Sequence, residues 1–118
     1  MVVSILGVPY KIEIHKISED EVLDKNKLDG YCSMSGRLIV IADLTEEKYF
    51  EWSCENEKNA YRKAVLRHEI THAFLNESGL SNSSVAPVGG WAKNEEMVDW
   101  IAIQFPKMLE VFEEVGCI

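Results

Sequence analysis

The chain has 118 residues, of which 47% are hydrophobic and 27% charged, and its 12 Lys and Arg against 20 Asp and Glu leave a net charge of -8. This size and balance predict one globular domain over residues 1–118 and exclude collagen-like, low-complexity and disordered chains. An acidic protein repels phosphate backbones, so we expect no nucleic-acid partner.

Neither a membrane span nor a signal peptide is expected. No apolar run approaches the roughly 18 residues that a span requires, and residues 1–6 lack the basic start and the longer apolar core of a signal peptide. We therefore expect a soluble, cytoplasmic protein without a membrane partner. The three cysteines, Cys32, Cys54 and Cys117, include no Cys-x-x-Cys pair, so free thiols are predicted.

The first residues predict two strands and a short helix. Residues 1–17 are rich in apolar and β-branched side chains on either side of a turn at residues 7–9, and apolar positions alternate with polar ones after it. This pattern indicates a strand pair with one buried face. Ser18, with Glu21 three residues later, is a helix-start signal, and the predicted helix runs to about residue 27.

The next part of the chain predicts a hairpin. Residues 31–42 turn at residues 35–36, and the returning arm, 37–42, is apolar on both faces, as in a well-buried strand. Residues 43–54 are predicted to be helical or mixed, with aromatic side chains as apolar anchors.

Two helices are predicted in the second half. Residues 55–77 contain neither Gly nor Pro and end before Gly79, a residue favoured in the left-handed conformation that closes helices. Residues 78–90 predict a loop, and residues 91–115 predict a second helix that Pro106 kinks or splits. The order of strands before helices predicts an α+β fold, with one layer of sheet against helices.

The predicted helix 55–77 carries the sequence His-Glu-x-x-His. His68 and His72 are four residues apart, so both imidazoles project from one face and can share a tetrahedral zinc ion. Glu69 flanks that position and is suited to take a proton from metal-bound water, whose pKa zinc lowers to about 7. The alternative is a helix with two paired histidines on a partly exposed face and no metal.

A catalytic zinc site needs a third protein ligand. Glu95 and Asp99 lie four residues apart at the start of the predicted second helix, and Glu95 can complete a His₂Glu site. Asp99 can accept the distal N–H of a ligand histidine and fix its tautomer. The alternative is that Asn94 caps the helix and the acidic residues favour its positive end.

These residues resemble the gluzincin pattern of thermolysin-type metallopeptidases. The match consists of two segments, His68-Glu69-Ile70-Thr71-His72-Ala73 and Asn94-Glu95-Glu96-Met97-Val98-Asp99. The short chain is more similar to minimal gluzincins and to the ImmA/IrrE-type metallopeptidases of phages and mobile elements, although Asp99 stands where the latter have Asn. The similarity covers roughly residues 30–106.

The resemblance implies one zinc ion per chain, held by His68, His72 and Glu95. It also implies a small antiparallel or mixed sheet packed on the zinc-binding helix and on a second ligand-bearing helix. In this superfamily a strand before the zinc helix pairs with an extended peptide substrate, which makes the hairpin 31–42 the candidate here. A repressor, if it is the substrate, is a separate protein. Manganese, cobalt or iron can occupy the same ligands.

Two functions are therefore considered. The first is a zinc-dependent peptidase that hydrolyses a peptide bond in a protein or peptide substrate with metal-activated water and with Glu69 as general base. The second is a metal-stabilised, non-catalytic protein-interaction module of phage or mobile-element type. Tyr31, Tyr49 and Tyr61 are each candidates to stabilise the oxyanion, and the sequence does not choose among them. His15 is expected to be a solvated surface side chain.

Overall fold

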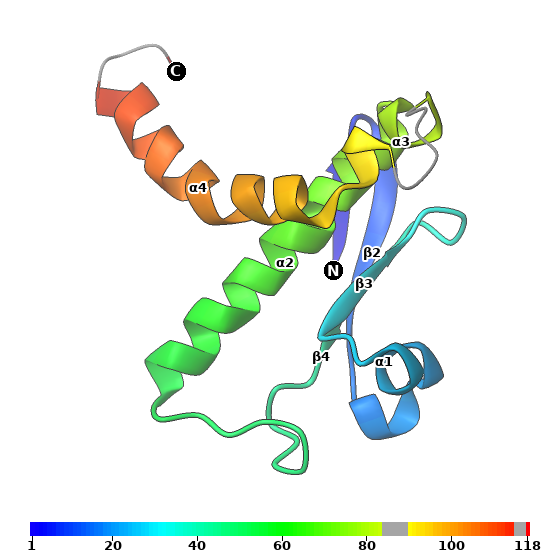
Figure 1. The fold of residues 1–118 in the computed structure, drawn as a ribbon, viewed down its shortest axis with the longest axis vertical. Helices are drawn as coiled ribbons and strands as arrows, with labels where there is room; N and C mark the ends of the chain where they lie inside the picture. The colour runs from blue at the N-terminus through cyan, green and yellow to red at the C-terminus, as the bar shows by residue number, and fades with distance from the viewer. Residues whose placement is uncertain (84–89, 115–117) are drawn as a thin grey trace.

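The computed structural model describes residues 1–83, 90–114 and 118, and in them the chain forms one sheet with helices on both faces (Figure 1). The strands are β1 (Val2–Ile5), β2 (Val8–His15), β3 (Gly30–Ser33) and β4 (Leu38–Ala42). The α-helices are α1 (Glu21–Asn26), α2 (Glu55–Glu77), α3 (Leu80–Ser83) and α4 (Glu95–Glu114), and the 3-10 turns are η1 (Ile17–Glu19) and η2 (Trp91–Lys93).

The sheet has the order β1-β2-β4-β3. β4 pairs in parallel with β2 and antiparallel with β3, so the sheet is mixed and the α+β prediction is confirmed. Residues 39–42 of β4 are all buried, which agrees with the apolar run that predicted a buried strand. β3 is an edge strand as a consequence, and its outer side has no strand partner within the sheet.

The apolar side chains of β4 alternate between two cores. One core lies between the sheet and α2, and the other lies on the opposite face beneath α1 and the segment 43–54. The buried residues of the first core are Ile5, Tyr10, Ile39, Ile41 and Ala73. Those of the second core are Ile17, Leu23, Val40, Ala42 and Leu44. Because side chains alternate along a strand, one five-residue strand anchors both layers.

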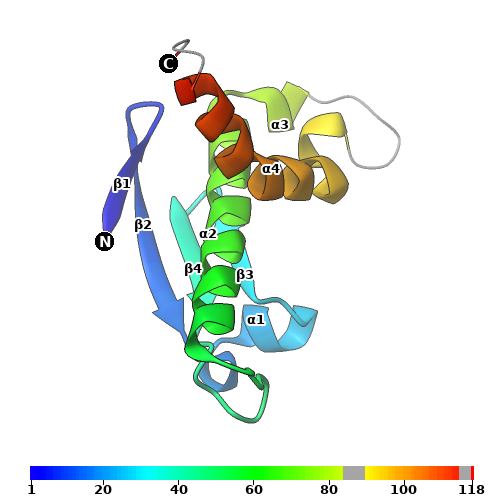
Figure 2. The same cartoon turned by 90° about the vertical axis from the view of Figure 1, so that its left-hand side faces the viewer.

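The long helix α2 runs along the sheet, and α4 crosses α2 (Figure 2). Arg67 of α2 donates a hydrogen bond from Nε to the carbonyl oxygen of Ala102 at 2.6 Å, which ties the two helices together. Pro106 lies inside α4 and does not split it, although Figure 1 shows the helix changing direction along its length. No helix in the described ranges has both the length and the apolar character needed to cross a membrane.

Two predictions about the N-terminal half need correction. The first turn lies at Leu6 and Gly7, both with positive φ, rather than at residues 7–9, because the two-residue hairpin favours left-handed residues at both positions. Asp20 rather than Ser18 caps α1, since its Oδ1 accepts the backbone N–H groups of Val22 and Leu23 at 2.9 and 3.1 Å. The hydroxyl of Ser18 instead donates to Glu46 at 2.6 Å.

Two predicted segments also differ from the structure. Residues 43–54 form turns without a helix, because Asp43 accepts the backbone N–H and the hydroxyl of Thr45 and closes a local turn. The predicted loop 78–90 contains the one-turn helix α3, and its residues 84–89 lie outside the described residues. Gly79 has a φ of 80°, as predicted for the end of α2. Cys32 and Cys54 are free thiols, and Cys117 lies outside the described residues.

Candidate metal centre

The helix α2 brings its two motif histidines together. His68 and His72 lie one turn apart, and their Nε2 atoms face each other at 3.0 Å. Both side chains are 20% exposed, so they are largely enclosed but open toward a cavity. Burial lowers the pKa of His72, which favours the neutral imidazole that binds metals.

The start of α4 supplies a third donor to the same point. Asn94 caps this helix by accepting the backbone N–H of Met97 at 2.9 Å, and Glu95 follows at once. Glu95 Oε2 lies 3.0 Å from Nε2 of His68 and 3.3 Å from Nε2 of His72. Ligand atoms about 2.0–2.1 Å from a tetrahedral zinc ion are roughly 3.3 Å apart, so this triangle has the size that zinc requires.

A fourth residue fixes the orientation of one histidine. Nδ1 of His68 lies 2.7 Å from Oδ1 of Asp99, one turn after Glu95 on α4. A neutral His68 that donates from Nδ1 to this carboxylate keeps a lone pair on Nε2, directed at the triangle. Lone pairs of neighbouring nitrogen and carboxylate atoms repel one another, and a cation between them removes that repulsion. The donor set therefore fits a metal ion.

Glu69 lies beside the histidines without being part of this triangle. One ligand atom from each of His68, Glu69 and His72 lies within 4.8 Å of the others, so this looser group can also hold an ion. Glu95 is the better third ligand on distance, because it is within 3.3 Å of both nitrogens. The side chain of Glu69 also lines the cavity into which the two histidines open.

The environment of Glu69 favours proton exchange near neutral pH. The residue is only 6% exposed, and this burial raises its pKa to about 7, with His68 opposing the rise and Glu95 and Asp99 adding to it. A carboxyl group with such a pKa can both accept and return a proton at neutral pH. This value describes the metal-free chain, and a bound cation lowers it.

Gly30 explains how Glu69 is enclosed. A Cβ atom at this position would lie 2.9 Å from Cγ1 of Val65, 3.0 Å from the carbonyl oxygen of Val40 and 3.2 Å from Cγ of Glu69. The absence of a side chain at Gly30 therefore allows the edge strand β3 to approach α2 closely beside Glu69. This role of Gly30 was not predicted, because the contact joins residues far apart in the chain.

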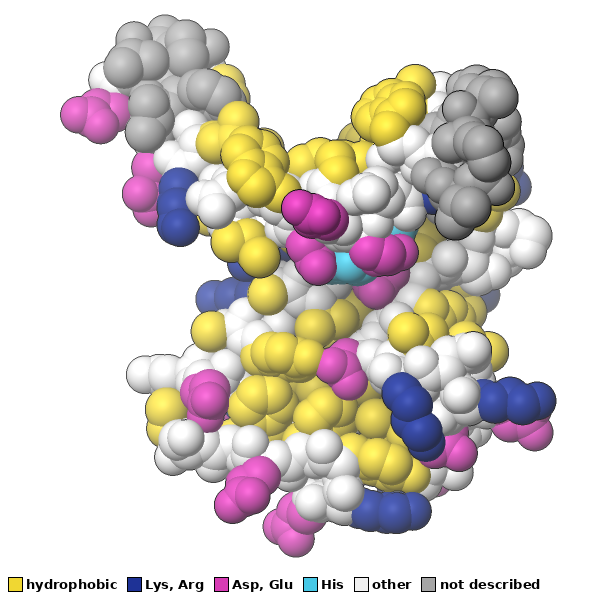
Figure 3. Space-filling model, in the orientation of Figure 1, with side chains coloured by type: hydrophobic (Ala, Val, Ile, Leu, Met, Phe, Trp, Pro, Cys, Tyr) yellow, Lys and Arg dark blue, Asp and Glu magenta, His cyan; other side chains and the backbone are white. Residues whose placement is uncertain are grey.

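Two cavities meet at the candidate metal centre. One, of about 420 Å³, extends along β3 toward α3 and η2, and the other, of about 390 Å³, extends toward the start of α2. Both are lined by Leu28, Gly30, His68, Glu69 and Glu95. Figure 3 shows histidine side chains in the hollow beneath α4, with acidic side chains around them.

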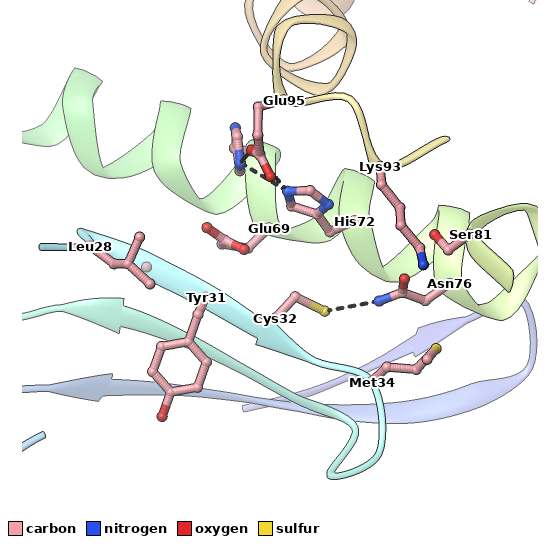
Figure 4. A pocket seen from close by; sticks show the side chains of 12 residues that line it. Leu28, Tyr31, Cys32, Met34, Glu69, His72, Asn76, Ser81, Lys93 and Glu95 are labelled. Atoms are coloured by element: carbon pink, nitrogen blue, oxygen red, sulfur yellow. Dashed lines mark hydrogen bonds and ion pairs between the residues drawn. The ribbon is translucent and has the colours of Figure 1, made fainter. Parts of the chain in front are cut away.

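Two of the three tyrosines considered from the sequence line the cavities, Tyr31 the larger one and Tyr61 the smaller one. The hydroxyl groups of Tyr31 and Tyr61 donate to Asp20 and Asp29, and Tyr49 packs in the core on the far face of the sheet. Figure 4 shows Tyr31 pointing away from the histidines.

His15 is more constrained than a solvated histidine. Its Nδ1 lies 2.6 Å from Oδ2 of Asp20, and its Nε2 lies 2.8 Å from Oε2 of Glu13. The side chain is 31% exposed, in agreement with the predicted surface position, and its two acidic partners were not predicted.

Three polar residues of the cavity were missed by the sequence analysis. Asn76, Ser81 and Lys93 line the larger cavity, and Figure 4 shows them at the end away from Glu69. Their only sequence signal is that Asn76 follows His72 by one helical turn and thus lies on the same face. Ser81 and Lys93 reach the cavity through tertiary packing, which no local pattern reveals.

No family model, curated protein or solved structure matches this chain. The resemblance to gluzincins therefore depends on the two sequence segments and on the site geometry.

Proposed function

We propose that the protein is a zinc-dependent peptidase. The observation that carries this proposal is the triangle of His68 Nε2, His72 Nε2 and Glu95 Oε2, with sides of 3.0, 3.0 and 3.3 Å. Three protein ligands leave one position of a tetrahedral ion open, as in catalytic rather than structural zinc sites. The buried carboxyl group of Glu69 lines the same cavity, which adds a general base to the ligand set.

Each residue has a distinct role in this proposal. His68, His72 and Glu95 hold the ion, and Asp99 positions His68 through the bond to its Nδ1. When bound, zinc acidifies a water molecule and polarises the carbonyl group of a peptide bond. Glu69 accepts the proton of the attacking water and later delivers it to the leaving amine.

The edge strand β3 offers a place for the substrate backbone. Of the two arms of the hairpin 31–42, β4 is paired on both sides and β3 on one side only, so β3 is the arm that can accept another strand. Residues of β3 line the larger cavity, and Gly30 lines both cavities. An extended peptide added to β3 gains main-chain hydrogen bonds and passes the metal centre.

Metal content is the first test. Mass spectrometry should find one zinc ion per chain in the wild type, and His72→Ala and Glu95→Gln should lose or weaken its binding. Absence of metal after dialysis against zinc would refute the peptidase proposal.

The variant Glu69→Gln tests the chemical step separately. It should retain zinc, because Glu69 is not a proposed ligand, while peptide hydrolysis falls by about 10²–10⁴-fold. Undiminished cleavage by this variant would remove Glu69 from the mechanism.

A second function, that of a metal-stabilised interaction module without catalysis, is supported by an apolar surface. A hollow of about 500 Å³ between α2 and α4 is lined mainly by apolar side chains, and Phe74 and Phe105 are 43% and 47% exposed. Such a surface is typical of protein contacts. A broad peptide library distinguishes the two functions, since the zinc-loaded module would bind a partner and cut no peptide.

A further inference from the structure

The cavity of about 420 Å³ that extends from the candidate metal centre along β3 has polar side chains at its far end. Figure 4 shows the side chains of Lys93, Asn76 and Ser81 turned toward one another at the end away from Glu69. Ser81 is only 3% exposed, and Nδ2 of Asn76 donates to Sγ of Cys32 at 3.8 Å. An ammonium, an amide and a hydroxyl group thus line one end of the same cavity.

The charge of Lys93 is uncompensated within the described residues. Lys93 is the one Lys or Arg that lines this cavity, and no carboxylate of residues 1–83 or 90–114 forms an ion pair with it. Lys27 and Lys58, by contrast, are paired with acidic residues three positions away. A cation without a carboxylate partner among residues 1–83 and 90–114, beside the nearly buried hydroxyl group of Ser81, is a local site for an anion in a chain with a net charge of -8.

The backbone holds Lys93 at a fixed place relative to the metal ligands. Its N–H donates to the carbonyl oxygen of Gly90 at 2.9 Å in the turn η2, and Ala92 beside it is fully buried. Glu95 follows two residues later and lines the same cavity. The cavity volume of about 420 Å³ equals that of a sphere roughly 9 Å across, and about three residues of an extended peptide span this length.

We propose that Lys93, Asn76 and Ser81 form a carboxylate-binding subsite that selects substrates with an acidic group within about three residues of the cleaved bond. This inference rests on the proposed peptidase function. The acidic group is the side chain of an Asp or Glu residue or the carboxylate at the substrate's C-terminus. Lys93 supplies the charge, and the hydroxyl group of Ser81 supplies a directed hydrogen bond. Asn76, which donates one N–H of its amide to Cys32, has a second N–H for the carboxylate.

The test compares paired peptides that differ by one charge. A peptide cut by the zinc-loaded wild type is remade with Glu or Gln at each of the three positions on either side of the cut, and with a free or an amidated C-terminus. The wild type should prefer the acidic member at one position by about tenfold in kcat/KM, which also decides between the two sources of the carboxylate. Lys93→Met should reduce this ratio to about one, and Lys93→Arg should keep most of it.

A matched variant controls for the change in net charge. Lys63 is exposed on α2 and lines neither of the two cavities at the candidate metal centre. Lys63→Met changes the net charge by the same amount as Lys93→Met and should leave the preference for acidic peptides unchanged. Equal cleavage of acidic and neutral peptides by the wild type would overturn the inference. So would a preference that survives in Lys93→Met.

Binding measurements separate the subsite from catalysis. Fluorescein-labelled hexapeptide pools with Glu or Gln at one fixed position are titrated against the zinc-loaded Glu69→Gln protein and read by anisotropy. If the wild type cuts no peptide, the proposed function fails. The subsite then stands only if the Glu69→Gln protein binds the Glu pool more tightly than the Gln pool, and if adding Lys93→Met removes this difference in affinity. Equal binding of the pools, or no binding of either, would overturn the subsite.

Discussion

Replacing Gly30 by Ala tests the close contact between β3 and α2. The added methyl group would lie 2.9 Å from Cγ1 of Val65 and 3.0 Å from the carbonyl oxygen of Val40. Neither atom moves easily, because Val65 is a β-branched residue within a helix and the Val40 oxygen belongs to the backbone of the central strand. Gly30 does not have a positive φ, so the strain comes from packing rather than from backbone conformation.

The expected loss of stability follows from these contacts. Overpacking of a filled core costs about 1–3 kcal/mol, and removing a glycine returns about 0.4–1 kcal/mol by restricting the unfolded chain. We expect a net loss of about 1–2 kcal/mol, which lowers the Tm by about 4 °C per kcal/mol in a chain of this length. The added group would also lie 3.2 Å from Cγ of Glu69, so kcat/KM should fall while zinc affinity holds.

Thermal and urea unfolding of the metal-free protein measure this loss. Val65→Ala makes room for the new methyl group, so Gly30→Ala should cost less in that background than in the wild type. Gly7→Ala is the control: its φ is 85° and its Cβ would meet nothing within 4 Å, so Val65→Ala should not rescue it. A Gly30→Ala protein as stable as the wild type, or one that Val65→Ala does not rescue, would refute the packing argument.

Three further predictions follow from other contacts. Asp99→Ala removes the acceptor at Nδ1 of His68, so zinc affinity should fall by about 10–100-fold in a chelator competition. Asp99→Asn keeps an acceptor oxygen and should lose less affinity. Equal zinc affinity in the wild type and both variants would contradict this role of Asp99. The hydrogen bond to Asp20 raises the pKa of His15, so the pair stabilises the fold fully below the ordinary histidine pKa and is lost as pH rises through the raised value. His15→Gln should therefore cost about 0.5–1 kcal/mol in urea unfolding at pH 6 and less at pH 9, and a cost that does not vary with pH would refute the ion pair. Arg67→Met removes the bond to α4 and should destabilise the chain by about 1–2 kcal/mol; unchanged unfolding would show that the bond contributes nothing.

Much of the local structure was predictable from the chain. Helix α2 has the predicted bounds, because residues 55–77 lack Gly and Pro and Gly79 can adopt the left-handed conformation that ends the helix. The spacing of His68 and His72 placed both side chains on one face for the same local reason. For residues 43–54, predicted to be helical or mixed, the helical alternative was wrong, since side-chain turns such as that of Asp43 compete with helix formation.

The sequence by itself determined the helical spacing of the motif and the buried strand β4, because both depend on neighbours within a few residues. Tertiary structure alone decided that β3 is the edge strand and that Glu95 and Asp99 meet the two histidines. It also brought Lys93, Asn76 and Ser81 to one end of the cavity. These contacts join residues far apart in the chain, and packing of α2 against both β3 and α4 fixes them.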